Sequence, residues 1–222
     1  MRQDKDNHGQ IGMLTTMTVQ IPELSEETKR ASLYQTLQDL PAGDPWIFGY
    51  GSLMWNPGFN FKEQVPAVAY GFHRAFCVSS FHYRGTPQKP GLVLGLDRGG
   101  SCRGLAFNIQ RADAEQVLSY LWQREMTTGI YTPRFIRLHM LTGDRPYISG
   151  LTFVANSQHP QYTGDLSLAD MAKRISEACG QSGDCHGYLT RTVDHLDQLG
   201  IPDGSVHRIL REVKSYRAKQ KN

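Results

Sequence analysis

Short apolar runs alternate with turn residues through the middle of the chain, from Trp46 to about Ala155. The runs are rich in β-branched and aromatic residues, which are typical of strands. Their regular spacing indicates a curled sheet or a small barrel. The clearest runs read VPAVAYGFHRAFCVSS, GLVLGL, RGLAFNI, FIRLHML and GLTFVA.

Helical patterns precede, interrupt and follow this β region. Residues 25–40 predict one helix, and residues 112–126 predict another that is inserted between strands. Three more helical stretches follow the last strand. Gly180 and Gly200 stand where left-handed C-caps would end the first two, and Asp203 is a candidate N-cap for the third. The layout predicts an α+β fold, in which a mixed sheet or barrel is followed by a helical tail.

The composition indicates a globular protein of 222 residues, a length that suits one sizeable domain with or without extensions. The net charge is only +3. The basic residues are most concentrated near the C-terminus, where a solvated helix explains them better than a nucleic-acid site does. We therefore expect no nucleic-acid partner.

Compartment and redox state can also be predicted. No stretch reaches the roughly 18 apolar residues of a membrane span, and the polar N-terminus does not resemble a signal peptide. None of the cysteines forms a C-x-x-C pair, so we expect reduced thiols in a cytoplasmic protein rather than a disulfide framework or a zinc site. The cysteines are Cys77, Cys102, Cys179 and Cys185.

One carboxylate falls on the predicted core side of the helix at residues 112–126. The apolar stripe of this helix runs to Leu121, and four residues further it reaches Glu125. A desolvated carboxylate has a raised pKa and suits a general base near neutral pH. The alternative is a structural ion pair with Arg84 or Arg103, or a side chain that reaches solvent at the helix end. The TTG sequence just beyond could form the edge of a pocket.

A second candidate is the run WIFGYGSLMW, which is interrupted at Gly49 and Gly51. A strand that ends in a glycine-rich turn exposes backbone N–H groups, which suit a carboxylate or a developing oxyanion. A β-bulge that bends the sheet is the alternative, and the residues alone leave both open. In HYRGTPQKPGL, Arg84 is either a cation presented by a stiff loop or part of an ordinary proline-rich turn.

Common cofactor and metal motifs do not fit. The third glycine of a dinucleotide fingerprint would fall on Met54, and no G-K-[ST] follows it. Ser52 lacks the flanking glycines of a nucleophile elbow. The histidines are scattered without the spacing of metal ligands, so we expect no metal site.

Five segments stand in order along the chain: WIFGYGSLMW, RGTPQKPGL, YLWQREMTTGIY, FVANSQHPQYTG and GQSGDCHGYL. They resemble, in the same order, the motifs of the ChaC-type glutathione-specific γ-glutamylcyclotransferases. The sequence departs from these motifs at Cys185, where asparagine is usual, and at His159, where asparagine usually precedes the proline.

This resemblance implies a compact mixed β-barrel with packed helices, which we expect over residues 45–222. Residues 1–44 are expected to form an N-terminal leader with one helix, and the part of it before Pro41 matches none of the family motifs. It implies cleavage of glutathione to 5-oxoproline and cysteinylglycine, without cofactor or metal, and with Glu125 as the general base. By match to the motifs, the expected substrate-binding residues are Phe48, Gly49, Tyr50, Gly51, Ser52 and Leu53, with Arg84 and Tyr188 as weaker candidates.

Two other functions remain open at this point. The first is the same chemistry on other γ-glutamyl amines or dipeptides, because the sequence does not show the shape of the pocket beyond the γ-glutamyl group. The second is a non-enzymatic regulator of cation transport. Glu125 argues against the second, because a pure binding module has no need for a carboxylate on a core face.

Overall fold

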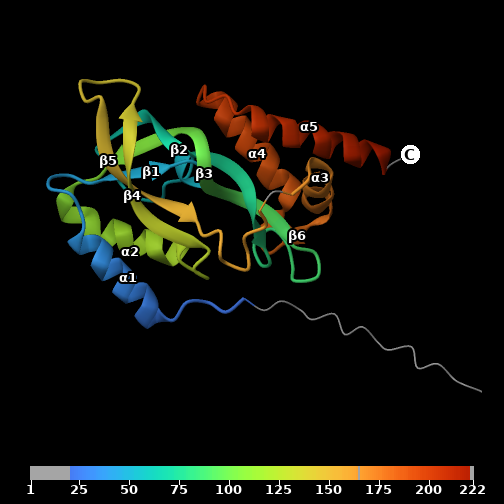
Figure 1. Cartoon of the computed structure of the whole chain (residues 1–222), viewed down its shortest axis with the longest axis horizontal. Helices are drawn as coiled ribbons and strands as arrows, with labels where there is room; N and C mark the ends of the chain where they lie inside the picture. The colour runs from blue at the N-terminus through green and yellow to red at the C-terminus, as the bar shows by residue number, and fades with distance from the viewer. Residues whose placement is uncertain (1–20, 165, 221–222) are drawn as a thin grey trace, which may run out of the picture.

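The computed structural model describes residues 21–164 and 166–220 (Figure 1). Within them, five strands form a closed barrel in the order β1-β3-β2-β4-β5. The pairs β1–β5 and β3–β5 are parallel and the other pairs are antiparallel, so the predicted mixed barrel is confirmed. The strands are β1 (Trp46–Gly49), β2 (Glu63–Ser80), β3 (Gly91–Asn108), β4 (Tyr131–Met140) and β5 (Tyr147–Ala155).

The long hairpin of β2 and β3 dominates the barrel. Its pairing runs from Glu63 opposite Asn108 to Ser80 opposite Gly91. The register shifts twice along β2, and Gly71 lies at the first shift with a φ of +82°. Such irregularities bend a strand and increase its twist, which lets a sheet of only five strands close.

The helices lie in two groups on different sides of the barrel (Figure 1). The helices α1 and α2 lie side by side, and α3, α4 and α5 form the second group. The helices are α1 (Glu26–Gln38), α2 (Ala114–Glu125), α3 (Leu168–Glu177), α4 (Cys185–Gln198) and α5 (Gly204–Lys219). The short elements are the 3₁₀ turns η1 (Ser52–Met54) and η2 (Arg111–Asp113) and the two-residue strands β6 (Cys179–Gly180) and β7 (Gly183–Asp184).

Two of the three predicted helix caps after the barrel are confirmed. Gly200 follows α4 with a φ of +63°, and the Asp203 carboxylate accepts a hydrogen bond from the third residue beyond it at the start of α5. The prediction for Gly180 is wrong, because α3 already ends at Glu177 and Gly180 pairs in β6 without a positive φ. A glycine is required at position 180 because the chain passes close to the backbone of His82 there, and a Cβ would lie 2.5 Å from the His82 carbonyl oxygen.

The basic C-terminal stretch forms α5, whose apolar face is buried. Its buried positions are Val206, Ile209, Leu210 and Val213. Most of its basic side chains are exposed, as a solvated helix requires.

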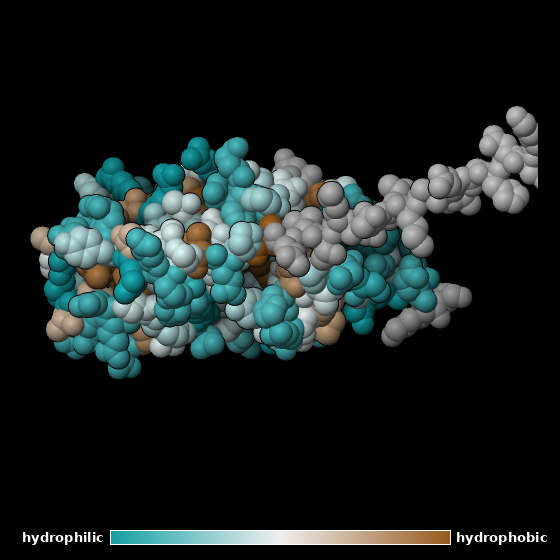
Figure 2. Space-filling view, turned by 90° about the horizontal axis from the view of Figure 1, so that it is seen from below, coloured by the Kyte–Doolittle hydropathy of each residue, from teal (hydrophilic) through white to brown (hydrophobic). Residues whose placement is uncertain are grey.

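The face of the molecule in Figure 2 is largely hydrophilic, with small separate apolar spots. None of the helices in the described part of the chain has the length and apolar character of a membrane span.

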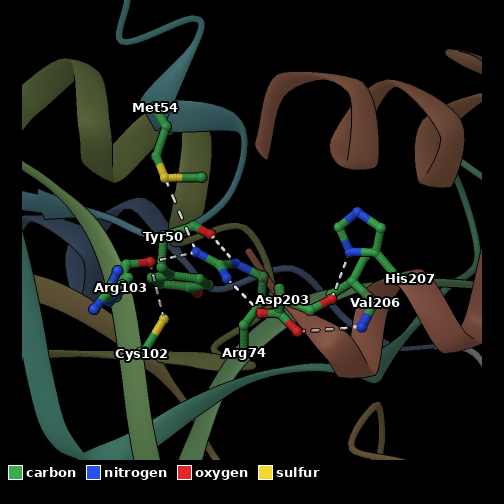
Figure 3. A network of polar contacts seen from close by, with 8 residues as sticks. All are labelled: Tyr50, Met54, Arg74, Cys102, Arg103, Asp203, Val206 and His207. Atoms are coloured by element: carbon green, nitrogen blue, oxygen red, sulfur yellow. Dashed lines mark hydrogen bonds and ion pairs between the residues drawn. The ribbon is translucent and has the colours of Figure 1, made fainter. Parts of the chain in front are cut away.

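A buried arginine connects the barrel to the C-terminal helices (Figure 3). The side chain of Arg74 in β2 is 1% exposed, and its Nη1 lies 2.6 Å from the Asp203 carboxylate at the start of α5. Its Nη2 donates to the carbonyl oxygen of Arg103 in β3 at 2.6 Å, and its Nε donates to the carbonyl oxygen of Tyr50 at 2.5 Å. Three segments that are far apart in the sequence therefore share one guanidinium group.

We expect Asp203→Asn to lower the free energy of unfolding by about 3–5 kcal/mol, because it leaves the buried guanidinium of Arg74 without its carboxylate. Asparagine can still cap α5, so loss of the cap does not account for the effect. Urea denaturation followed by circular dichroism measures the change. Asp184→Asn is the matched control, since Asp184 caps α4 in the same way but pairs with no buried arginine. Equal effects of the two substitutions would contradict the prediction.

Candidate active site

The first part of the site is a glycine turn at the end of β1. All four residues of β1 are buried, and its pairing with β3 is continuous to Gly49 opposite Leu105. The strand therefore ends at Gly49 and contains no bulge. Gly51 follows, and the chain then enters η1. The sequence left open a β-bulge or a strand that ends in a glycine-rich turn, and the structure shows the strand that ends in a turn.

The second part is Glu125, the last residue of α2. The buried stripe of this helix ends in Leu121 and Trp122, and Glu125 lies on the same side with a side chain that is 19% exposed. The prediction that Glu125 faces the core is confirmed. Its side chain lines a small chamber, described next, whose other lining residues carry no charged side chain.

The glycine turn and Glu125 line the same chamber, whose volume is about 60 Å³. Ser52, Glu125, Tyr131 and Tyr188 also line a wider cleft of about 1090 Å³, so the chamber opens into the cleft. The residues that line the chamber are Tyr50, Gly51, Ser52, Leu53, Leu94, Glu125, Tyr131, Phe153 and Tyr188.

Burial dominates the electrostatics of the chamber. It raises the pKa of the Glu125 carboxyl above its ordinary value, and the positive charge of Arg124 opposes this shift only in part. Burial also raises the pKa of Tyr50 and Tyr131 well above the ordinary value and that of Tyr188 to about 12. The three phenols therefore stay protonated at neutral pH and surround a single carboxylate.

Two of these phenols are held in place by backbone carbonyl groups. Tyr50 donates to the carbonyl oxygen of Phe153 at 2.9 Å, and Tyr131 donates to that of Leu94 at 2.6 Å. Each hydroxyl oxygen keeps lone pairs that can accept a further hydrogen bond. Apart from Glu125, the polar side chains that line the chamber are therefore uncharged.

The ion-pair partner of Glu125 differs from both predicted partners. Its Oε1 lies 3.2 Å from Nε of Arg124. Arg103 is exposed and contributes its backbone carbonyl to Arg74, as described above. Arg84 donates from Nη1 to the carbonyl oxygen of Ser182 and lies over the ring of Tyr188 at 5.3 Å. The spacing of residues along the chain could not distinguish these arginines, because it does not show which of them reaches the end of α2.

The structure places most of the predicted site residues at the cavity, but two of them elsewhere. Arg84 lines the wider cleft and Tyr188 lines both cavities. Phe48 and Gly49 line neither cavity. The ring of Phe48 is fully buried. It packs closely against Gly104, since a Cβ added to this glycine would lie only 2.7 Å from the ring. These two residues support the turn from behind.

Sequence reasoning missed three residues that line the chamber: Leu94, Tyr131 and Phe153. Tyr131 is the last residue of YLWQREMTTGIY, so the motif itself could have indicated it. Phe153 is the first residue of FVANSQHPQYTG, so that motif could have indicated it in the same way. Leu94 lies on β3 outside all five segments and carried no such signal. The threonines after Glu125 do form the edge of a pocket, since Thr127 and Thr128 line the wider cleft.

Both departures from the family motifs make defined contacts. The buried thiol of Cys185 lies 3.1 Å from the carbonyl oxygen and 3.3 Å from the amide nitrogen of Leu92 in β3. The ring of His159 lies 3.0 Å from the carbonyl oxygen of Thr128 and accepts from the amide of Gln161 at 3.2 Å. Cys185 thus holds the start of α4 to the barrel, and His159 holds the loop that follows Glu125.

Within the part of the chain that the structure describes, no three histidine, cysteine, aspartate or glutamate side chains gather as a possible metal site.

Comparison with a solved structure identifies the class of fold. A yeast γ-glutamyl cyclotransferase described as specific to glutathione superimposes with a TM-score of 0.72 at 22% identity, over 78% of this chain and 97% of that one. This likeness shows a fold of the γ-glutamylcyclotransferase-like type.

Sequence comparisons identify the family. Residues 45–216 match the family of ChaC-like proteins. The Escherichia coli protein named glutathione-specific gamma-glutamylcyclotransferase is 38% identical over 195 residues, which are 87% of this chain and 84% of that protein. The protein of the same name from Schizosaccharomyces pombe is 34% identical over 200 residues, which are 82% of this chain and 97% of that protein. The chain belongs to the ChaC-like family, as its five motifs predicted.

We expect Gly49→Ala to lower the free energy of unfolding by about 1–3 kcal/mol, because its Cβ would lie 3.0 Å from the Cβ of Leu53 and 3.2 Å from the Phe107 ring. Gly51→Ala is the matched comparison and should cost less, since its nearest neighbour, Leu94, lies at an ordinary contact distance of 3.4 Å. Thermal and urea unfolding of both variants measure the difference. A larger loss for Gly51→Ala would show that this packing argument is wrong.

Proposed function

We propose that this protein cleaves glutathione into 5-oxoproline and cysteinylglycine, with Glu125 as the general base. The observation that carries the proposal is the placement of Glu125 beside the glycine turn in one chamber. The names of the relatives supply the substrate, and the geometry supplies residues that suit the reaction.

The substrate carries its own nucleophile in this reaction. The α-amine of the γ-glutamyl group loses a proton and attacks the γ-carbonyl carbon, which closes a five-membered ring. The bond from that carbon to the cysteinyl nitrogen then breaks, and this nitrogen takes a proton. Because both reacting groups belong to one molecule, the enzyme mainly has to hold them in an attack geometry.

Glu125 has the properties that the proton transfers require. Its raised pKa makes the carboxylate a better base than an exposed glutamate. It would take the proton from the α-amine and then deliver it to the leaving cysteinyl nitrogen. Such a general acid/base typically contributes on the order of a hundred- to ten-thousand-fold in rate.

The glycine turn is suited to a negatively charged oxygen. Ser52 and Leu53 begin η1, where the first N–H groups of a helical turn have no acceptor within it. Gly51 has no side chain to block access to the backbone from the chamber. These N–H groups would bind the α-carboxylate of the substrate or the oxyanion formed during ring closure.

The protonated phenols complete the γ-glutamyl site in this proposal. Tyr50, Tyr131 and Tyr188 bring hydroxyl groups to the chamber without adding a charge that would compete with Glu125. Arg84 lies further out, in the cleft, where the cysteinylglycine part of the substrate would extend. Its guanidinium suits the terminal carboxylate of the glycyl residue.

Glu125→Gln should keep the fold and reduce 5-oxoproline formation from glutathione by on the order of a hundredfold or more, because glutamine cannot accept the amine proton. Product is measured by chromatography with glutathione, γ-glutamyl-alanine and oxidised glutathione as substrates.

Product from glutathione alone supports the proposal, and product from γ-glutamyl-alanine as well indicates a broader γ-glutamylcyclotransferase. A folded Glu125→Gln protein with normal turnover would refute the role of Glu125. A wild-type protein that yields no product from any of the three would refute the enzyme itself.

Arg84→Met should raise the KM for glutathione by on the order of tenfold or more while kcat changes little, because the lost contact is remote from the reacting atoms. Glutathione with its glycyl carboxylate esterified provides the control. The wild-type protein should show a similar rise in KM with this ester, and Arg84→Met should show little further rise. Additive effects of the substitution and the ester would place the carboxylate elsewhere.

A further inference from the structure

We propose that Arg124 is a positioning residue of this site, which holds the Glu125 carboxylate at a fixed place relative to the glycine turn. This inference rests on the proposed function of Glu125. It concerns a residue outside the chamber lining that acts through two residues inside it.

One guanidinium group connects the two halves of the site. Nε of Arg124 lies 3.2 Å from Oε1 of Glu125, and Nη2 donates to the hydroxyl of Ser52 in η1 at 2.8 Å. Nη1 donates to the carbonyl oxygen of Asn56 at 2.7 Å and to the hydroxyl of Tyr120 at 3.1 Å. The guanidinium plane is rigid, so these contacts set the separation between the carboxylate and the turn.

This arrangement is unusual for consecutive residues of a helix. Neighbouring side chains on a helix point in different directions and do not normally pair. Here α2 ends at Glu125, and the next residue, Met126, already leaves the helical conformation with a ψ of 41°. Arg124 reaches from the last turn of α2 across to the loop after β1, and Tyr120 supports it from one helical turn earlier.

Arg124 also supplies the positive charge that Glu125 contacts. The groups that face Glu125 from the other elements are Tyr50 after β1, Tyr131 in β4 and Tyr188 in α4, and all three are neutral at neutral pH. Burial raises the pKa of Glu125, and the charge of Arg124 acts in the opposite direction. Loss of this charge would favour the protonated acid and raise the pKa further. The basic form of Glu125 would then be reached only at higher pH.

Two substitutions separate the charge of Arg124 from its planar geometry. In Arg124→Met, the rise of kcat/KM with pH should shift to higher pH, and kcat should fall by on the order of tenfold to a hundredfold. Arg124→Lys keeps the charge but not the fork, so its pH profile should stay close to that of the wild type while kcat still falls. Arg211→Met, which removes an exposed charge from α5, is the control and should leave the pH profile unchanged.

A second measurement does not depend on turnover. Carbon-13 NMR of the Glu125 side chain in the substrate-free protein gives its titration midpoint directly, and this midpoint should rise in Arg124→Met but not in Arg211→Met. An unchanged midpoint and an unchanged pH profile in Arg124→Met would overturn the proposal and leave Arg124 a purely structural residue. If the wild-type protein makes no 5-oxoproline, the proposed function fails, and the NMR titration still decides whether Arg124 controls Glu125.

Discussion

The buried guanidinium of Arg74 is the interaction on which the arrangement of the site depends. A charge at this depth is tolerated only when it is paired and hydrogen-bonded. The chain satisfies it with the Asp203 carboxylate from α5 and with carbonyl groups of Arg103 and Tyr50 (Figure 3). These partners come from the C-terminal helices, from β3 and from the glycine turn. The conformation of the turn is thus coupled to how the helical tail packs on the barrel.

A second arginine, Arg124, holds the carboxylate of Glu125, as Arg74 holds the backbone of the glycine turn. Arg74 binds the turn from the barrel side through a backbone carbonyl, whereas Arg124 binds it from the α2 side through the Ser52 hydroxyl. The turn lines a chamber whose phenols stay protonated and whose carboxylate is that of Glu125. Such a site can change the protonation of one group without disturbing other charges, which suits a reaction made of two proton transfers.

Much of this could be read from local patterns in the sequence. The apolar stripe of α2 identified Glu125, because the side that a helical residue faces follows from its spacing. The regular spacing of apolar runs predicted the barrel. Gly200 identified the end of α4, and Asp203 identified the start of α5. The same reasoning failed where two distant segments meet. Gly180 is required by the backbone near His82, and Phe48 supports the turn rather than lining the cavity.

The sequence by itself determined the order of the main strands and helices, the side on which Glu125 lies and, through five ordered motifs, the family. The tertiary structure decided which arginine pairs with Glu125, that Tyr131 joins the chamber, and that the interruption in WIFGYGSLMW is a turn after a strand. The physical reason is the range of the interactions involved. Helical periodicity and capping act within a few residues, whereas the pairing of buried charges and the walls of a cavity depend on segments that only the closed barrel brings together.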